Sequence, residues 1–235
     1  MLRGIVFDLD GTLYRQRPLR KAMLWRLLRA YATRPLSLLR TLRVLGAYRQ
    51  AQEHLRQSVA SPTARPDLAE AQLRLTCERT HAQPAFVAAC VARWMDQEPL
   101  TILARYLQPG LLDFLRACQA RGLRLGVLSD YPAEAKLKAL GLGDRFDVVL
   151  AAQSPEVGVF KPHPRGLLLA AERLGVRPDE CVYVGDRAEV DGPAAEAAGM
   201  PCFIVTSYPE LHQLIWGHPG DQAPVGAAQP SLHRR

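Results

Sequence analysis

The fold of this chain is decided near its start, by the stretch Gly4-Ile5-Val6-Phe7-Asp8-Leu9-Asp10-Gly11-Thr12-Leu13-Tyr14. A short apolar run of β-forming residues is followed by two carboxylates, one residue apart, and then by a turn-forming pair. This pattern predicts a buried strand that delivers Asp8 and Asp10 at its carboxyl end. If the strand stays regular, both side chains lie on the same face, where they repel each other. We therefore expect a divalent cation, a Lys or Arg partner, or both.

Composition places the chain among globular proteins. It has 235 residues, of which 48% are hydrophobic and 23% charged, and it contains no apolar run long enough to span a membrane. A cleaved signal peptide at the amino terminus would remove the first strand, so we do not expect one. The five cysteines are scattered and form no CxxC pair, which indicates reduced thiols. These features predict a cytoplasmic protein.

Positive charge is concentrated between residues 15 and 105, which hold 16 Lys/Arg and 6 Asp/Glu. No acidic residue stands between Asp10 and Glu53. Three interpretations stay open: a solvated face, a lid that steers an anionic substrate, or a surface for an acidic protein, RNA or an anionic membrane. No RNA motif with interleaved aromatic residues is present, so nucleic acid is not expected as a partner. Trp25 and Tyr31 are expected in the core of the helices.

Two patterns divide the chain. Helical spacing of apolar residues runs from Tyr14 to about residue 94, with a break at Pro35 and separate helices expected over residues 38–45 and 47–59. From residue 109 onward, strands alternate with helices that end at glycine, the strands lying at residues 123–128, 146–151, 181–184 and 202–205. This alternation predicts an α/β fold with a parallel sheet covered on both faces. A short helix over residues 211–216 and a disordered tail over residues 217–235 complete the prediction.

Polar residues stand at the carboxyl ends of the predicted strands, where ligands gather in an open parallel sheet. They supply carboxylates, a hydroxyl and a cation: Asp8 and Asp10, Ser129, Lys161, and Asp186 with Asp191. A nucleophilic carboxylate, a hydroxyl, a cation and further metal-seeking carboxylates are the components of phosphoryl transfer through an aspartyl phosphate.

With these motifs in order, the chain resembles the haloacid dehalogenase (HAD) superfamily. The match consists of Asp8-Leu9-Asp10-Gly11-Thr12, Leu128-Ser129, Lys161-Pro162, and Gly185-Asp186 followed by Asp191. The resemblance implies a Rossmann-like catalytic core over residues 1–14 and 106–216. It also implies that residues 15–105 form an inserted α-helical cap of the C1 type.

The resemblance also implies roles for the motif residues. Asp8 would attack phosphorus, and Asp10 would protonate the leaving oxygen and later activate water. The Asp8 side chain, the Asp10 carbonyl and Asp186 would hold Mg²⁺, a hard cation that needs few protein oxygens. Lys161 would neutralise Asp8 and a phosphoryl oxygen, Ser129 would bind another such oxygen, and Asp191 would orient Lys161 or a metal-bound water.

Within this superfamily, Asp10 favours hydrolysis of a phosphate ester. The branch that cleaves haloalkanoates lacks this second Asp, because a halide leaving group needs no proton. We therefore expect a Mg²⁺-dependent phosphatase, a phosphoric monoester hydrolase acting on a small phosphorylated metabolite through an aspartyl phosphate. The alternatives are a phosphomutase or pyrophosphatase of the same superfamily, or a non-enzymatic module that binds an acidic partner through the basic segment. The natural substrate and the oligomeric state stay open.

One neighbour of the predicted phosphate site is unexpected. Asp130 occupies a place where relatives often have Asn or Gly. Its carboxylate would be unfavourable beside a phosphate unless it points away, so it is excluded from the catalytic set.

Overall fold

A five-stranded parallel sheet forms the centre of the computed structural model, which describes residues 1–58 and 67–217. The strand order is β3-β2-β1-β4-β5, with neighbouring strands parallel. The bounds are β1 Gly4–Phe7, β2 Arg124–Ser129, β3 Val148–Ala151, β4 Cys181–Gly185 and β5 Cys202–Ile204. The predicted α/β fold with a Rossmann-like sheet is confirmed. Because β1 is central, its carboxyl end meets those of β2 and β4.

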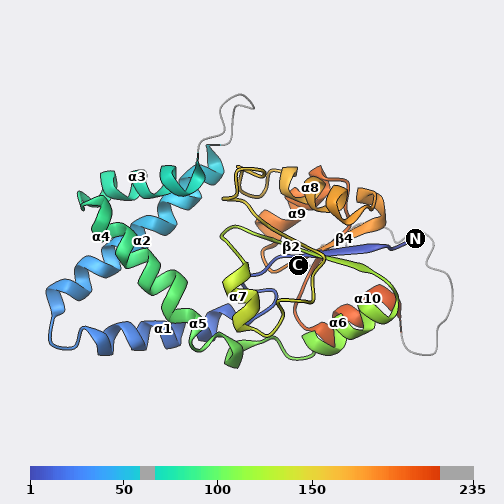
Figure 1. The fold of residues 1–235 in the computed structure, drawn as a ribbon, viewed down its shortest axis with the longest axis horizontal. Helices are drawn as coiled ribbons and strands as arrows, with labels where there is room; N and C mark the ends of the chain where they lie inside the picture. Colours follow the sequence, from blue (N-terminus) through green and yellow to red (C-terminus); the bar gives the residue numbers. More distant parts are fainter. Residues whose placement is uncertain (59–66, 218–235) are drawn as a thin grey trace, which may run out of the picture.

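Helices cover both faces of the sheet (Figure 1). Ile5 and Phe7 of β1 pack in the same core as helices α6, α7 and α10, which span Leu111–Ala120, Glu134–Ala139 and Tyr208–Trp216. Val6, between them in sequence, faces the other way, toward α8 (Arg165–Leu174) and α9 (Ala188–Ala197). This alternation follows from the period of two along a strand. It explains why every residue of β1 is apolar and buried.

A second group of helices lies beyond one end of the sheet (Figure 1). We call residues 16–100 the helical segment; its elements are α1 (Gln16–Ala30), α2 (Pro35–Gln57), α3 (Leu68–Thr80), α4 (Pro84–Val91), a π-helical turn η1 (Ala92–Gln97) and α5 (Glu98–Leu100). It has its own small core around Val44, Tyr48 and Val87. Two short 3₁₀ turns complete the fold, η2 (Leu103–Tyr106) and η3 (Pro178–Glu180).

Two expectations for the helical segment are wrong. Residues 35–57 form one continuous helix instead of two, and Gly46 lies inside it. A single glycine costs a helix only about 1 kcal/mol, which the packing of α2 offsets. Trp25 is 73% exposed instead of buried, whereas Tyr31 packs against Trp94 with ring centroids 5.9 Å apart.

Two further observations concern the ends and surfaces of the chain. The predicted disordered tail falls, apart from Gly217, outside the described residues. Among residues 1–58 and 67–217, every helix is too short or too polar to cross a lipid bilayer.

Candidate active site

Asp8 lies at the carboxyl end of β1, and neighbouring groups fix both of its oxygens. Its backbone N–H donates to the carbonyl of Val184 on β4 at 2.8 Å, which extends the sheet register by one residue. Its Oδ1 accepts from Lys161 Nζ at 2.7 Å and its Oδ2 accepts from Thr12 Oγ1 at 3.2 Å. Burial raises the pKa of Asp8 to about 7, an effect that Lys161 opposes and Asp191 adds to.

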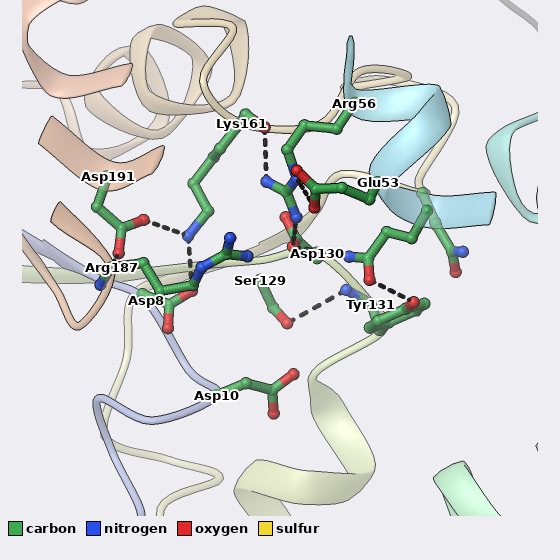
Figure 2. A network of polar contacts seen from close by, with 12 residues as sticks. Asp8, Asp10, Glu53, Arg56, Ser129, Asp130, Tyr131, Lys161, Arg187 and Asp191 are labelled. Atoms are coloured by element: carbon green, nitrogen blue, oxygen red, sulfur yellow. Dashed lines mark hydrogen bonds and ion pairs between the residues drawn. The ribbon is translucent and has the colours of Figure 1, made fainter. Parts of the chain in front are cut away.

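Lys161 is the cation at the centre of this site (Figure 2). Its three N–H groups donate to Asp8 Oδ1, Tyr183 Oη and Asp191 Oδ1, each at 2.7 Å. Burial alone would lower the pKa of Lys161, but these neighbours hold it well above its ordinary value. The ammonium therefore stays charged. All three donors are in use, so a phosphoryl oxygen that binds Lys161 must share or replace one of these partners.

Asp10 is bound by a different lysine from Asp8. Lys136 of α7 places Nζ 2.6 Å and 2.9 Å from the two carboxylate oxygens of Asp10, and the Tyr14 hydroxyl also donates to Oδ1. Burial would raise the pKa of Asp10, but Lys136 and Tyr14 hold it below its ordinary value. Because β1 ends at Phe7, the two aspartates lie in a loop and share no strand face. A lysine partner was expected, but Lys136 was not singled out.

Asp191, on the first turns of α9, contacts both Lys161 and the loop after β4. Its Oδ1 accepts from Lys161, and its Oδ2 accepts from the backbone N–H groups of Asp186 and Arg187 at 3.1 Å and 3.0 Å. Lys161 holds the pKa of this carboxyl below its ordinary value, although burial opposes that. Asp191 therefore fixes the ammonium and the backbone of Asp186 together.

The carboxylate of Asp186 packs directly on the loop that carries Asp8 and Asp10. A Cβ atom placed on Gly11 would stand 2.0 Å from Asp186 Oδ2, and Asp186 Oδ1 is buried without a hydrogen-bond partner among the described residues. Burial, together with the charge of Asp191, raises the pKa of Asp186 to about 6. A buried carboxylate with an unpartnered oxygen, close to another carboxylate, suits a hard divalent cation.

The possible ligands for such a cation are few. Within residues 1–58 and 67–217, no cluster of three or more His, Cys, Asp or Glu side chains is arranged to hold a metal. The set predicted from the sequence uses two carboxylates, from Asp8 and Asp186, and the main-chain carbonyl of Asp10. The orphaned oxygen of Asp186 and the tight contact at Gly11 fit that set.

Ser129 is the last residue of β2 and lies beside Asp8. The helical segment contacts the next residue along the chain, Asp130. The Ser129 hydroxyl is buried and accepts from the N–H of Tyr131 at 3.3 Å. Asp130 Oδ2 accepts from Arg56 Nη2 at 2.7 Å (Figure 2). It also accepts from Gln52 Nε2 at 2.9 Å, and both donors are on α2. The sequence does not single out Arg56, because nothing distinguishes it among the 14 Lys and Arg residues of the helical segment.

A cavity of about 500 Å³ opens beside these residues. It is bounded by the end of α2, the loop after Lys161 and the start of α9, and its charged lining residues are Glu53, Arg56, Arg187 and Glu189. The two arginines and two glutamates in this lining balance each other in formal charge. The cavity therefore offers a polar space next to the carboxyl ends of the strands.

Comparisons with known proteins agree with this geometry. A family model described as haloacid dehalogenase-like hydrolase matches residues 2–199. A phosphoglycolate phosphatase from Shigella boydii is 32% identical over 87% of this chain and 81% of its own length. A glyceraldehyde 3-phosphate phosphatase from Methanopyrus kandleri is 32% identical over 85% of this chain and 82% of its own length. The crystal structure of a HAD phosphatase from Thermococcus onnurineus superposes with a TM-score of 0.57, at 23% identity, over 92% of this chain and 99% of that one.

The chain belongs to the haloacid dehalogenase-like hydrolases, because the family model covers most of its length and both curated relatives cover more than four-fifths. The family predicted from the four motifs is therefore confirmed. Both curated relatives are phosphatases, in agreement with the enzyme class predicted from the sequence.

Proposed function

We propose that this chain hydrolyses a small phosphate monoester in two steps through an aspartyl phosphate on Asp8. One observation carries the proposal: Asp8 lies at the carboxyl end of the central strand, bonded to a buried lysine, with the carboxylate of Asp186 packed over the same loop. A carboxylate held beside a cation and a metal-binding carboxylate is suited to attack a phosphorus atom.

In the first step, an oxygen of Asp8 forms a bond to phosphorus while the bond between phosphorus and the leaving oxygen breaks. Asp10 protonates that leaving oxygen, which requires its contacts with Lys136 and Tyr14 to loosen when substrate binds, because those contacts lower its pKa and favour the ionised carboxylate. In the second step, Asp10 takes a proton from water, the water oxygen bonds to phosphorus, and the bond to Asp8 breaks, which releases phosphate and restores the carboxylate. Lys161 and Ser129 would hold phosphoryl oxygens as negative charge develops on them.

Mg²⁺ is the cation we propose for Asp8, the carbonyl of Asp10 and Asp186. When bound, it would supply positive charge beside the phosphoryl group and keep Asp8 ionised. Asp191 would keep the Asp186 loop in place through its two bonds to backbone N–H groups. The unpartnered oxygen of Asp186 and the elevated pKa values of Asp8 and Asp186 support this assignment.

We also propose that residues 15–105 act as a cap over this site and that the protein is cytoplasmic. Contacts of α2 with Asp130 and with the backbone of Lys161 support the first proposal. The second is supported by the five cysteines, all of which are free thiols.

The test is phosphate release from an aryl phosphate by the purified protein. Wild type should turn over with Mg²⁺, lose activity in EDTA and regain it when Mg²⁺ is restored. Asp8→Asn should lose at least about 10³-fold in kcat, because the amide is a poor nucleophile. Asp179→Asn is the matched control, since that carboxylate is 66% exposed in a surface ion pair. Full activity of Asp8→Asn would refute the mechanism.

A panel of phosphate esters, rather than a single compound, is needed to identify the natural substrate. Phosphoglycolate and glyceraldehyde 3-phosphate come first, because the curated relatives are named for them. Sugar phosphates, nucleotides and pyrophosphate follow. Release of free phosphate identifies a phosphatase, whereas an isomeric phosphate ester as the product identifies a mutase.

A further inference from the structure

Asp130 presents a physical difficulty in the site just described. Its backbone follows Ser129 directly, and its carboxylate carries a negative charge next to the place where a phosphate dianion is proposed to bind. Its side chain is only 16% exposed, and Oδ1 is buried without a hydrogen-bond partner among the described residues. Water therefore solvates this charge poorly, and the repulsion of an incoming phosphate would be strong.

Two donors on α2 compensate this charge. Gln52 and Arg56 stand one helical turn apart, and both donate to Asp130 Oδ2. Gln52 also accepts from the Tyr131 hydroxyl, which in turn accepts from Gln72 of α3. The helical segment thus docks on the loop after β2 by recognising Asp130 and its neighbour.

The Arg56 guanidinium joins two loops of the sheet at once. Besides Asp130, it donates from Nη1 to the main-chain carbonyl of Lys161 at 2.6 Å and from Nε to Glu53 at 3.2 Å. Its side chain is only 4% exposed, whereas that of Glu53 is 47% exposed and remains hydrated. Glu53 is therefore stabilised mainly by water, whereas the buried charge of Asp130 is stabilised mainly by Arg56.

We propose that Arg56 is a positioning residue that neutralises Asp130, so that the loop carrying Ser129 can hold a phosphate dianion only while α2 is docked. The inference rests on the proposed function and adds a condition to it. Without Arg56, the carboxylate of Asp130 remains next to the proposed phosphate site without its ion-pair partner, and only Lys161 and Arg187, which pair with other carboxylates, offset its charge. The affinity for phosphate is then set by the helical segment, through a residue that need not touch the substrate.

Calorimetric titration of inorganic phosphate into the Mg²⁺-loaded, full-length protein tests this proposal without requiring turnover. Arg56→Met should weaken phosphate binding at least about tenfold, because an unpaired buried carboxylate then faces the anion. Adding Asp130→Asn to Arg56→Met should restore the affinity to within about threefold of wild type, because the repelling charge is gone. Aryl phosphate turnover should show the same change mainly in KM rather than in kcat.

The controls separate charge compensation from a structural role. Arg173→Met breaks a surface pair with Glu156 and should leave phosphate binding unchanged. Asp130→Asn alone, which keeps Arg56, should bind phosphate at least as tightly as wild type, and this result does not depend on whether Arg56→Met folds. Arg56→Lys should bind more tightly than Arg56→Met, because it keeps the positive charge.

Three results would overturn the inference: unchanged phosphate affinity in folded Arg56→Met, a double variant as weak as Arg56→Met, or weaker binding in Asp130→Asn alone. If wild type neither binds phosphate nor hydrolyses an aryl phosphate, the proposed function fails as well. If wild type does both and the variants depart from the expected pattern, only the role of Arg56 is wrong.

Discussion

Lys161 and Asp191, 30 residues apart in the chain, form a buried ion pair in which Nζ and Oδ1 lie 2.7 Å apart. Asp191 is 1% exposed and Lys161 is 5% exposed, so water screens this pair little. Asp8 shares the same ammonium at the same distance. The charge on Lys161 is thus divided between the proposed nucleophile and Asp191, whose other oxygen accepts from two backbone N–H groups.

Asp191→Asn should lower kcat/KM about 10- to 100-fold, the range seen when groups that orient metal ligands are removed. The amide carries no negative charge to pair with the ammonium, so Lys161 interacts more strongly with Asp8. The amide also has only one oxygen, so it cannot accept both from Lys161 and from the two backbone N–H groups of the Asp186 loop as the carboxylate does. Steady-state kinetics at several Mg²⁺ concentrations measures both effects. Glu196→Gln is the control, because Glu196 is an exposed carboxylate on the same helix and does not line the cavity beside the site. Equal kinetics in the two variants would contradict the prediction.

Gly11→Ala should abolish Mg²⁺-dependent activity. Gly11 has φ +112°, and a Cβ atom there would meet the Asp186 carboxylate at 2.0 Å, so that carboxylate must leave its place over the loop. Gly141→Ala is the matched control, because Gly141 also has a positive φ, +72°, but open space around the Cβ position. The control should lose about 1–2 kcal/mol of unfolding free energy and keep its activity. Phosphate release measures the effect of the clash with Asp186, and urea unfolding measures the backbone strain that both variants share.

The sheet was predictable from the sequence because its signals are local. β1 is an unbroken apolar run that ends in carboxylates, and α8 ends at a glycine, Gly175, in the left-handed conformation. Asp8 and Asp186 follow β1 and β4 directly and Ser129 ends β2, whereas Lys161 lies in the longer loop after β3. Their convergence on Lys161 then follows from parallel strands that share one edge of the sheet.

The contribution of the helical segment was not predictable in the same way. Arg56 acts where α2 meets two loops more than 70 residues away, and neither helical spacing nor charge count indicates which of many arginines docks. Lys136 is on a short helix with Lys138 close by, and the sequence does not show which of the two faces Asp10. Trp25 was misplaced because a helical period shows which residues share a face, not whether another element covers that face.

Tyr183→Phe should lower kcat about tenfold with a smaller change in KM. The Tyr183 hydroxyl accepts from Lys161 and donates to Asp191 at 3.1 Å, so its loss leaves one N–H of a buried ammonium without a partner. An unsatisfied buried donor also costs about 1–3 kcal/mol of stability. Tyr31→Phe, in the helical segment, is the control for removal of a tyrosine hydroxyl. Kinetics and thermal unfolding of both variants provide the measurement, and an unchanged kcat in Tyr183→Phe would contradict the prediction.

The protein should lose stability at alkaline pH through two buried thiols. Burial raises the pKa of Cys118 and of Cys181 to about 12, and these residues are 0% and 1% exposed. In the unfolded chain a thiol loses its proton near pH 8.5. Above that pH the unfolded state binds fewer protons than the folded state, so the free energy of unfolding falls as pH rises. The stabilisation is complete below about pH 8.5 and is lost progressively toward pH 12.

Between pH 8 and pH 10, each thiol should therefore lower the free energy of unfolding by about 2 kcal/mol, since one pH unit corresponds to about 1.4 kcal/mol for each proton. Urea unfolding at the two pH values measures this change. The double variant Cys118→Ala/Cys181→Ala should lose about 4 kcal/mol less than wild type over the same interval. Parallel pH dependence in wild type and the double variant would show that the two thiols are not the groups responsible.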